Sequence, residues 1–161
     1  TNELANLLGA SKDTIATYMD LLEKAFIIYR LEPLSRNLRN EISANRKIYF
    51  YDNGIRNALL SNYNPLSMRG DTGALWENFL MAERKKYLHY HRIAANTYFW
   101  RTKQQQEVDY VEERGGRFYA FEFKYNPKAK ARFSKSFLNA YQPEAQVVHK
   151  DNFHVFVMPS P

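Results

Sequence analysis

Two carboxylates and one lysine in the second half of the sequence have a spacing suited to metal-assisted phosphate chemistry. Asp109 lies in one strand-like run, and Glu122 and Lys124 lie in the next, with Gly115-Gly116 between the two runs. A Gly-Gly pair between two such runs predicts a two-residue hairpin turn. The register of that hairpin places Asp109 directly opposite Glu122, and Glu107 directly opposite Lys124.

This cross-strand pairing is unfavourable unless something compensates it, because like charges opposite each other on a sheet, ~5 Å apart, destabilise the sheet. A divalent cation between Asp109 and Glu122 reverses the sign of the interaction. Mg²⁺ (or Mn²⁺) takes one or two carboxylates and keeps waters, which leaves positions for a phosphate. Strand alternation places Lys124 on the same face as Glu122. Lys124 is therefore expected to orient or deprotonate the attacking water, or to stabilise charge developing on phosphorus.

A further carboxylate comes from a predicted helix. The apolar stripe that includes Trp76, Phe79 and Leu80 predicts a long helix over about 72–91, and Glu77 lies at the border of that stripe. If the helix packs on the sheet, Glu77 reaches the same site and supports the metal or the water. Strands are predicted at 97–101, 107–113, 117–125, 146–149 and 153–158, with a basic helix at about 128–141. This order indicates a mixed α/β fold, a central sheet flanked by helices.

The first part of the chain has the outline of a winged helix. Leu4, Leu7 and Leu8 predict a short helix that ends at Gly9, and Ser11 is the predicted N-cap of a second helix. Strand-like runs at 26–31 and 47–51 flank a polar loop at 35–46, the predicted wing. We expect a winged-helix-like domain over 1–62, a linker over 63–71 and the α/β domain over 72–161.

Composition narrows the classes of protein. The 161 residues have 45% hydrophobic content, 23 Lys and Arg against 17 Asp and Glu, a net charge of +6, and no cysteine. These features indicate a folded cytoplasmic protein without disulfides or thiolate metal sites. No apolar run is long enough to span a membrane, and no phosphate-binding loop for ATP is present, so no ATP cofactor is expected in this chain.

Basic residues supply the candidate contacts to nucleic acid, since a positive balance favours polyanionic partners. The wing contributes three of them and the segment after Lys124 contributes four. The candidates are Arg36, Arg39, Arg46, Lys128, Lys130, Arg132 and Lys135. For the four residues after Lys124 the alternative is a solvated helix face, and for the winged helix the alternative is packing against a neighbouring domain.

The ordered set Glu77, Asp109 and Glu122-x-Lys124 resembles the core motif of PD-(D/E)XK nucleases, with Val108 where the motif has proline. The runs 73–78, 99–102 and 107–109 are similar to more than this motif. They look like the C-terminal region of a family of prokaryotic AAA+-type ATPases. The resemblance covers nearly the whole chain and implies a winged helix followed by a restriction-endonuclease-like domain of uncharacterised function. It also implies a partner, an N-terminal ATPase domain that lies outside this chain.

Three functions are compatible with the sequence. The leading hypothesis is nucleic-acid binding with a Mg²⁺-dependent phosphodiesterase site, for which DNA and RNA are equally suitable. The rival is a non-catalytic module that uses the same fold as a scaffold or as a regulator of an ATPase. A third hypothesis is a component of a toxin–antitoxin or defence system.

Overall fold

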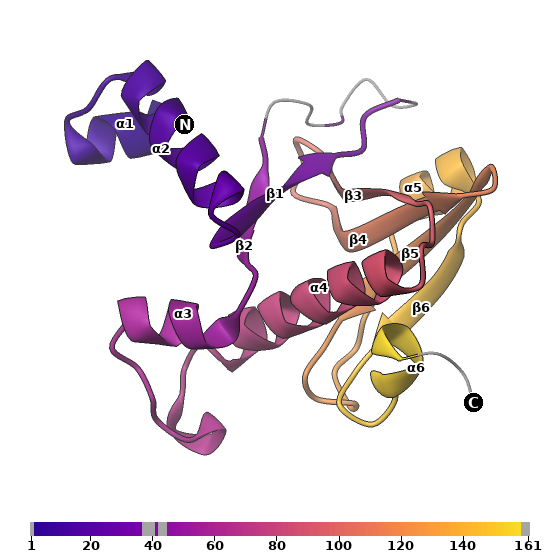
Figure 1. The fold of residues 1–161 in the computed structure, drawn as a ribbon. Helices are drawn as coiled ribbons and strands as arrows, with labels where there is room; N and C mark the ends of the chain where they lie inside the picture. Colours follow the sequence, from indigo (N-terminus) through magenta and orange to yellow (C-terminus); the bar gives the residue numbers. More distant parts are fainter. Residues whose placement is uncertain (1, 37–40, 42–44, 159–161) are drawn as a thin grey trace.

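The computed structural model describes residues 2–36, 41 and 45–158 (Figure 1). The chain begins with helices α1 (Asn2–Leu8) and α2 (Lys12–Lys24), then strands β1 (Ile28–Pro33) and β2 (Lys47–Phe50), then helix α3 (Asn53–Leu59). A short 3₁₀ helix, η1 (Leu66–Met68), leads into the long helix α4 (Thr72–Tyr90). The remaining elements are β3 (Asn96–Arg101), β4 (Glu107–Arg114), β5 (Arg117–Phe123), α5 (Lys135–Tyr141), β6 (Glu144–Val148) and α6 (His154–Val157).

The six strands form one mixed sheet in the order β2-β1-β3-β4-β5-β6. The pairs β1–β2, β3–β4 and β4–β5 are antiparallel, whereas β1–β3 and β5–β6 are parallel. The predicted mixed α/β fold with flanking helices is therefore confirmed. The two strands of the predicted N-terminal domain lie in the same sheet as the strands of the second part.

Two apolar cores lie on opposite faces of the sheet. On one face, Leu80 and Met81 of α4 and Phe156 of α6 pack against strand side chains such as Phe121. On the other face, Phe137 and Tyr141 of α5 pack against Trp100, Val108, Val111 and Ala120. Figure 1 shows α4 running along the sheet, while α1 and α2 project beyond the β1–β2 edge. Because both faces are covered, a polar group in the middle strands needs a partner within the protein.

The β4–β5 hairpin has the predicted register. Gly115 and Gly116 have φ values of 54° and 75°, a left-handed conformation that glycine adopts without a steric penalty. Arg114 pairs with Arg117, and the pairing continues to Tyr110 and Phe121. The same register brings Asp109 beside Glu122, as the sequence predicts.

Two predicted elements are wrong in type or length. The run 153–158 is not a strand but contains the helix α6. In this run Phe153, Phe156 and Val157 pack against the core on the face of the sheet that α4 covers. These positions have the i, i+3, i+4 spacing of a helix, which is hard to distinguish from strand alternation in so short a run. The basic helix expected from residue 128 begins only at Lys135, because its apolar anchors, Phe137 and Tyr141, lie beyond that residue.

Candidate functional site

Asp109 and Glu122 lie side by side where the β4–β5 ladder ends. Past the Tyr110–Phe121 pair, Asp109 Oδ2 accepts a hydrogen bond from the backbone N–H of Phe123 at 2.8 Å. The side chain of Asp109 is 16% exposed and that of Glu122 is 9% exposed. Two carboxylates are thus held together in a largely buried position.

Burial and mutual repulsion make both carboxyl groups weak acids. Burial, and then the negative charge of Asp109, raise the pKa of Glu122 to about 8. Burial, and then the charge of Glu77, raise the pKa of Asp109. The pair therefore holds a proton more tightly than either carboxyl group would in water. A bound divalent cation would displace this proton, because metal ligands bind in the deprotonated form.

Lys124 and Glu77 reach this region from different sides. Lys124 Nζ lies 3.3 Å from Glu122 Oε2 and is the cation at the outer rim of the pair. Glu77 comes from α4, and its Oε1 accepts hydrogen bonds from Tyr49 Oη at 2.6 Å and from Lys47 Nζ at 3.0 Å. The structure therefore brings all four predicted residues into one region, but Glu77 is held by β2 rather than by the Asp109–Glu122 pair.

Lys47, at the start of β2, is the central cation that the sequence analysis did not predict. Its Nζ lies 2.5 Å from Glu107, 3.0 Å from Glu77 and 3.9 Å from Asp109. Burial alone lowers the pKa of Lys47, but Glu77, Glu107 and Asp109 outweigh burial, so the pKa is raised overall. Sequence reasoning missed Lys47 because it assigned β2 to a separate domain. Glu107, expected opposite Lys124, instead forms its ion pair with Lys47.

A buried asparagine fixes the helix that carries Glu77. Asn78 is 4% exposed; its side chain accepts a hydrogen bond from the backbone N–H of Phe50 at 2.8 Å and donates one to the carbonyl of Phe50 at 3.1 Å. It also donates to Asn53 at 2.8 Å. These bonds attach α4 to the end of β2, so Glu77 and Lys47 are held at a fixed spacing.

Two adjacent carboxyl groups are ligands of the type that a hard divalent cation takes. Among the described residues, no group of three or more Asp, Glu, His or Cys side chains is arranged to hold a metal ion. Asp109 and Glu122 are compatible with Mg²⁺ or Mn²⁺, which complete their coordination with water and phosphate oxygens. Glu77 does not complete such a site in this arrangement, because Lys47 and Tyr49 occupy its Oε1.

The basic residues proposed to contact nucleic acid differ in their surroundings. Arg36 Nη1 pairs with Glu113 at 2.8 Å, and Arg46 Nε pairs with Glu32 at 2.6 Å. Arg39 lies outside the described residues. The remaining candidates are solvent-exposed in the irregular segment before α5 or at its first residue, namely Lys128, Lys130, Arg132 and Lys135.

One residue of the predicted wing is buried in the rest of the molecule. Glu41 is 6% exposed and accepts hydrogen bonds from Trp100 Nε1 at 2.7 Å and from Tyr141 Oη at 2.6 Å. It also forms a β-bridge with Thr102. This contact ties the predicted wing to the second part of the chain.

Comparisons with known proteins divide the chain near the predicted linker. A family model described as a domain of unknown function (DUF8612) matches residues 1–66, and one described as a domain of unknown function (DUF4143) matches residues 72–158. No solved structure matches the chain. Within the described residues, no helix has the length and apolar character needed to cross a membrane.

Uncharacterized proteins of Mycobacterium tuberculosis and Mycobacterium bovis are each 32% identical over 124 residues, which is 76% of this chain. The chain spans 27% of the length of these curated relatives. Glu77, Asp109, Glu122 and Lys124 lie inside the 72–158 match, whereas Lys47 lies inside the other. Because the 72–158 match covers more than half of the sequence, the chain belongs to the family described as a domain of unknown function, DUF4143.

Proposed function

We propose that Asp109 and Glu122 bind Mg²⁺ or Mn²⁺ and that the chain hydrolyses phosphodiester bonds in nucleic acid. The observation that supports this most directly is the position of Asp109 and Glu122, two adjacent carboxyl groups that are only 16% and 9% exposed. Strongly raised carboxyl pKa values in a group of charged side chains are typical of functional sites.

Each residue has a role that follows from its position. Asp109 and Glu122 hold the ion, and Glu122 loses its proton when they do so. With Mg²⁺ or Mn²⁺ held by Asp109 and Glu122, Lewis acidity would be available there to polarise a phosphoryl oxygen and to lower the pKa of a bound water. Lys124, at the rim, faces the incoming phosphate and offsets the charge that develops on it. Glu77 and Lys47 form an ion pair on the inner side of the site, and this pair keeps both side chains in place.

The test is cleavage of fluorescently labelled DNA and RNA, single-stranded and duplex, with Mg²⁺, with Mn²⁺ or with EDTA. We expect metal-dependent cleavage by the wild type, and a loss of at least about 100-fold in rate for Asp109→Asn and Glu122→Gln. Glu113→Gln is the matched control, since Glu113 lies on the same strand but pairs with Arg36. Cleavage that persists in EDTA or in Asp109→Asn would contradict the proposal.

A second candidate function, a non-catalytic scaffold or regulator, is favoured by one observation. Lys47 Nζ already lies within 4 Å of three carboxylates, where it compensates charge that a metal would otherwise compensate. In this alternative the cluster fastens β2 to the rest of the sheet, and the partner is a further domain of a longer ATPase-type protein, as the sequence resemblance implies. The melting temperature of the wild type would then not respond to Mg²⁺ or Mn²⁺, whereas the metal site predicts a rise that Asp109→Asn abolishes.

A further inference from the structure

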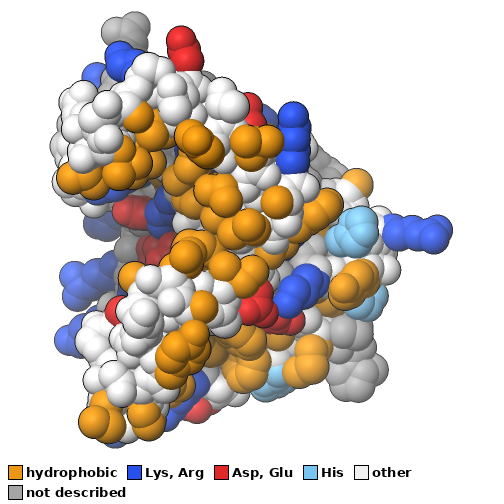
Figure 2. Space-filling model, turned by 60° about the vertical axis from the view of Figure 1, so that its left-hand side comes forward, with side chains coloured by type: hydrophobic (Ala, Val, Ile, Leu, Met, Phe, Trp, Pro, Cys, Tyr) orange, Lys and Arg blue, Asp and Glu red, His pale blue; other side chains and the backbone are white. Residues whose placement is uncertain are grey.

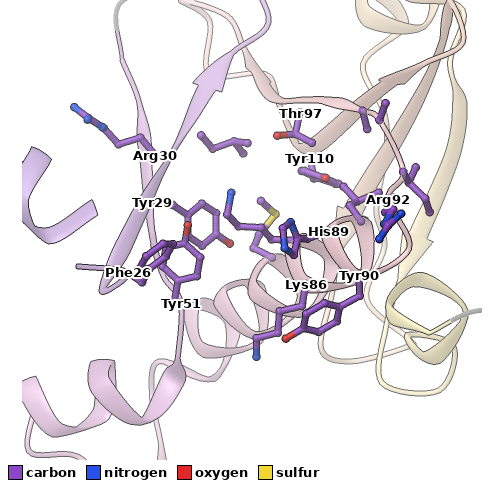
Figure 3. A pocket seen from close by; sticks show the side chains of 17 residues that line it. Phe26, Tyr29, Arg30, Tyr51, Lys86, His89, Tyr90, Arg92, Thr97 and Tyr110 are labelled. Atoms are coloured by element: carbon purple, nitrogen blue, oxygen red, sulfur yellow. The ribbon is translucent and has the colours of Figure 1, made fainter. Parts of the chain in front are cut away.

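A second candidate binding site is a cleft between β1 and the C-terminal half of α4, bordered by the segment that leads from α4 into β3. It has a volume of about 840 Å³, within the range of roughly 300–1,000 Å³ that is typical of ligand sites. Its apolar lining includes Phe26, Tyr29, Tyr51, Leu88 and Ile93. Figure 3 shows the aromatic residues of the strand side facing His89, Tyr90 and Arg92 across the cleft. Figure 2 shows hydrophobic side chains gathered across the middle of one face of the molecule.

The floor of the cleft contains a polar group without a partner. Tyr29 is 4% exposed, and among the described residues its buried hydroxyl has no hydrogen-bond partner. Burial raises the pKa of Tyr29, so the hydroxyl remains a neutral donor. Buried polar groups are almost always hydrogen-bonded, and an exception indicates a missing partner. A ligand with a carbonyl or ring-nitrogen acceptor would supply one.

The entrance of the cleft has an exposed aromatic residue in a strained conformation. Phe26 directly follows the end of α2, has a φ of 56° and is 70% exposed. This position, where the chain leaves a helix in the left-handed conformation, is normally glycine. Phenylalanine therefore costs stability here without burying its ring. Its edge contact with Tyr51 leaves most of the ring available for stacking.

The charge of the cleft is positive. Its lining includes Arg30, Lys85, Lys86 and Arg92, and no Asp or Glu is among the described residues that line it. Lys85 Nζ lies 4.8 Å from the centre of the Tyr29 ring and 5.7 Å from that of Tyr51. Arg30 is paired with Asp20 and Glu23, so Lys85 and Arg92 are the better candidates for contact with an anion.

From these features we infer that the cleft binds an unstacked nucleobase together with its phosphate, as offered by single-stranded nucleic acid or by a mononucleotide. The base stacks on Phe26 and Tyr51 and accepts a hydrogen bond from Tyr29, while Lys85 and Arg92 contact the phosphate. Aromatic faces combined with cations are how proteins bind single strands without reading sequence. This inference adds to the proposed function that the nucleic acid is single-stranded. It rests on the proposed function only in taking nucleic acid as the ligand.

The test is fluorescence anisotropy with labelled oligothymidylate and oligouridylate of ~12 nucleotides, a length that spans typical single-strand sites. Thymidine and uridine monophosphate serve as competitors, and a duplex of equal length serves for comparison. All titrations contain EDTA, so binding is measured without cleavage. We expect single strands to bind more tightly than the duplex. Direct binding of fluorescently labelled uridine monophosphate, with no binding of the oligonucleotides, would support the same site with a mononucleotide as its ligand.

Two variants separate binding from folding. Phe26→Gly removes the stacking ring and relieves the left-handed strain, so we expect a more stable fold with at least about tenfold weaker binding. Tyr29→Phe removes only the unpaired hydroxyl, so we expect unchanged or higher stability with about three- to tenfold weaker binding. Tyr63→Ala, which changes an exposed aromatic residue outside the cleft, is the control.

Charge is tested with Lys85→Glu, which should weaken binding, against Lys150→Glu, an exposed lysine outside the cleft. Because all these titrations contain EDTA, binding is measured apart from cleavage, and failure of the cleavage proposal would be visible separately. The inference is overturned if no ligand binds, if the duplex binds as tightly as the single strands, or if Phe26→Gly and Tyr29→Phe bind like the Tyr63→Ala control.

Discussion

Glu112 and Asp109, three positions apart on β4, differ in the charges that surround them. Glu112 is fully buried and is bound by Arg84, whose Nε and Nη2 donate to its two oxygens at 2.6 and 2.9 Å. Arg114 adds a second cation at 3.0 Å. Asp109 instead faces another carboxylate, that of Glu122, and both of their pKa values are raised.

The difference teaches how to distinguish a structural buried charge from a chemical one. Around Glu112, guanidinium donors satisfy both oxygens, and the remaining donor of Arg84 binds the carbonyl of Phe156 at 2.6 Å. That network links α4, β4 and α6, and both Glu112 oxygens already have partners within the protein, so no ligand is needed to compensate the charge. Around Asp109 and Glu122, the nearest cations, Lys47 and Lys124, stand 3.9 and 3.3 Å from the pair. This second cluster is incompletely compensated, which is what a cation site requires.

The largest effect on stability is expected at the structural pair. Glu112→Gln keeps the shape of the side chain but leaves Arg84 buried without its counter-ion, so we expect a loss of about 3–5 kcal/mol of unfolding free energy. Glu113→Gln, on the next residue, breaks a more exposed pair with Arg36 and should cost at most about 1 kcal/mol. Urea denaturation of both variants measures the difference. Equal losses would remove the distinction between the two kinds of site.

The carboxylate pair should make stability fall as pH rises. Glu122 has a folded pKa of about 8 against an ordinary value of 4.5, so the folded state holds its proton more tightly. The resulting stabilisation is fully present below about pH 4.5 and is lost as pH rises through about 8, on the order of a few kcal/mol. Glu122→Gln should flatten this decline when urea denaturation is repeated between pH 5 and pH 9. A decline of the same slope in the variant would show that other groups cause it.

Replacing Lys47 should lower the free energy of unfolding by less than Glu112→Gln does, and added metal should restore part of the loss. Lys47→Met leaves Glu77, Glu107 and Asp109 without their shared ammonium, and we expect a loss of about 1–3 kcal/mol without metal, less than for a fully buried pair. Mg²⁺ should restore part of it if the carboxylates bind metal, and the melting temperature of Lys47→Met should then rise with Mg²⁺ more than that of the wild type. Lys86→Met, which breaks an exposed pair with Glu83, is the matched control. A loss that Mg²⁺ does not restore would favour the scaffold.

The parts of the site that are local in sequence could be predicted, and the parts that depend on distant pairing could not. Gly115-Gly116 sets the hairpin register, so the approach of Asp109 to Glu122 follows from the sequence alone. Lys47 reaches the site only because β1 pairs in parallel with β3 and carries β2 with it. No local pattern reports such a pairing. The burial of Glu122 was equally hidden, because it depends on helices covering both faces of the sheet.

Replacing Lys124 is expected to change stability least. It also tests whether this cation at the rim acts on the carboxyl group of Glu122. The side chain of Lys124 is 35% exposed, so the ion pair with Glu122 should contribute at most about 1 kcal/mol to stability. Lys124 nevertheless lowers the pKa of Glu122, against burial and Asp109, which raise it. Lys124→Met should therefore fold normally while the carboxyl resonance of Glu122 titrates at a higher pH in carbon-13 NMR. Arg84 is expected to show the reverse: its replacement should strongly destabilise the fold, because it leaves Glu112 buried without a counter-ion. If Lys124→Met leaves the titration of Glu122 unchanged, Lys124 does not act on the pair, and its place in the proposed phosphate chemistry is lost.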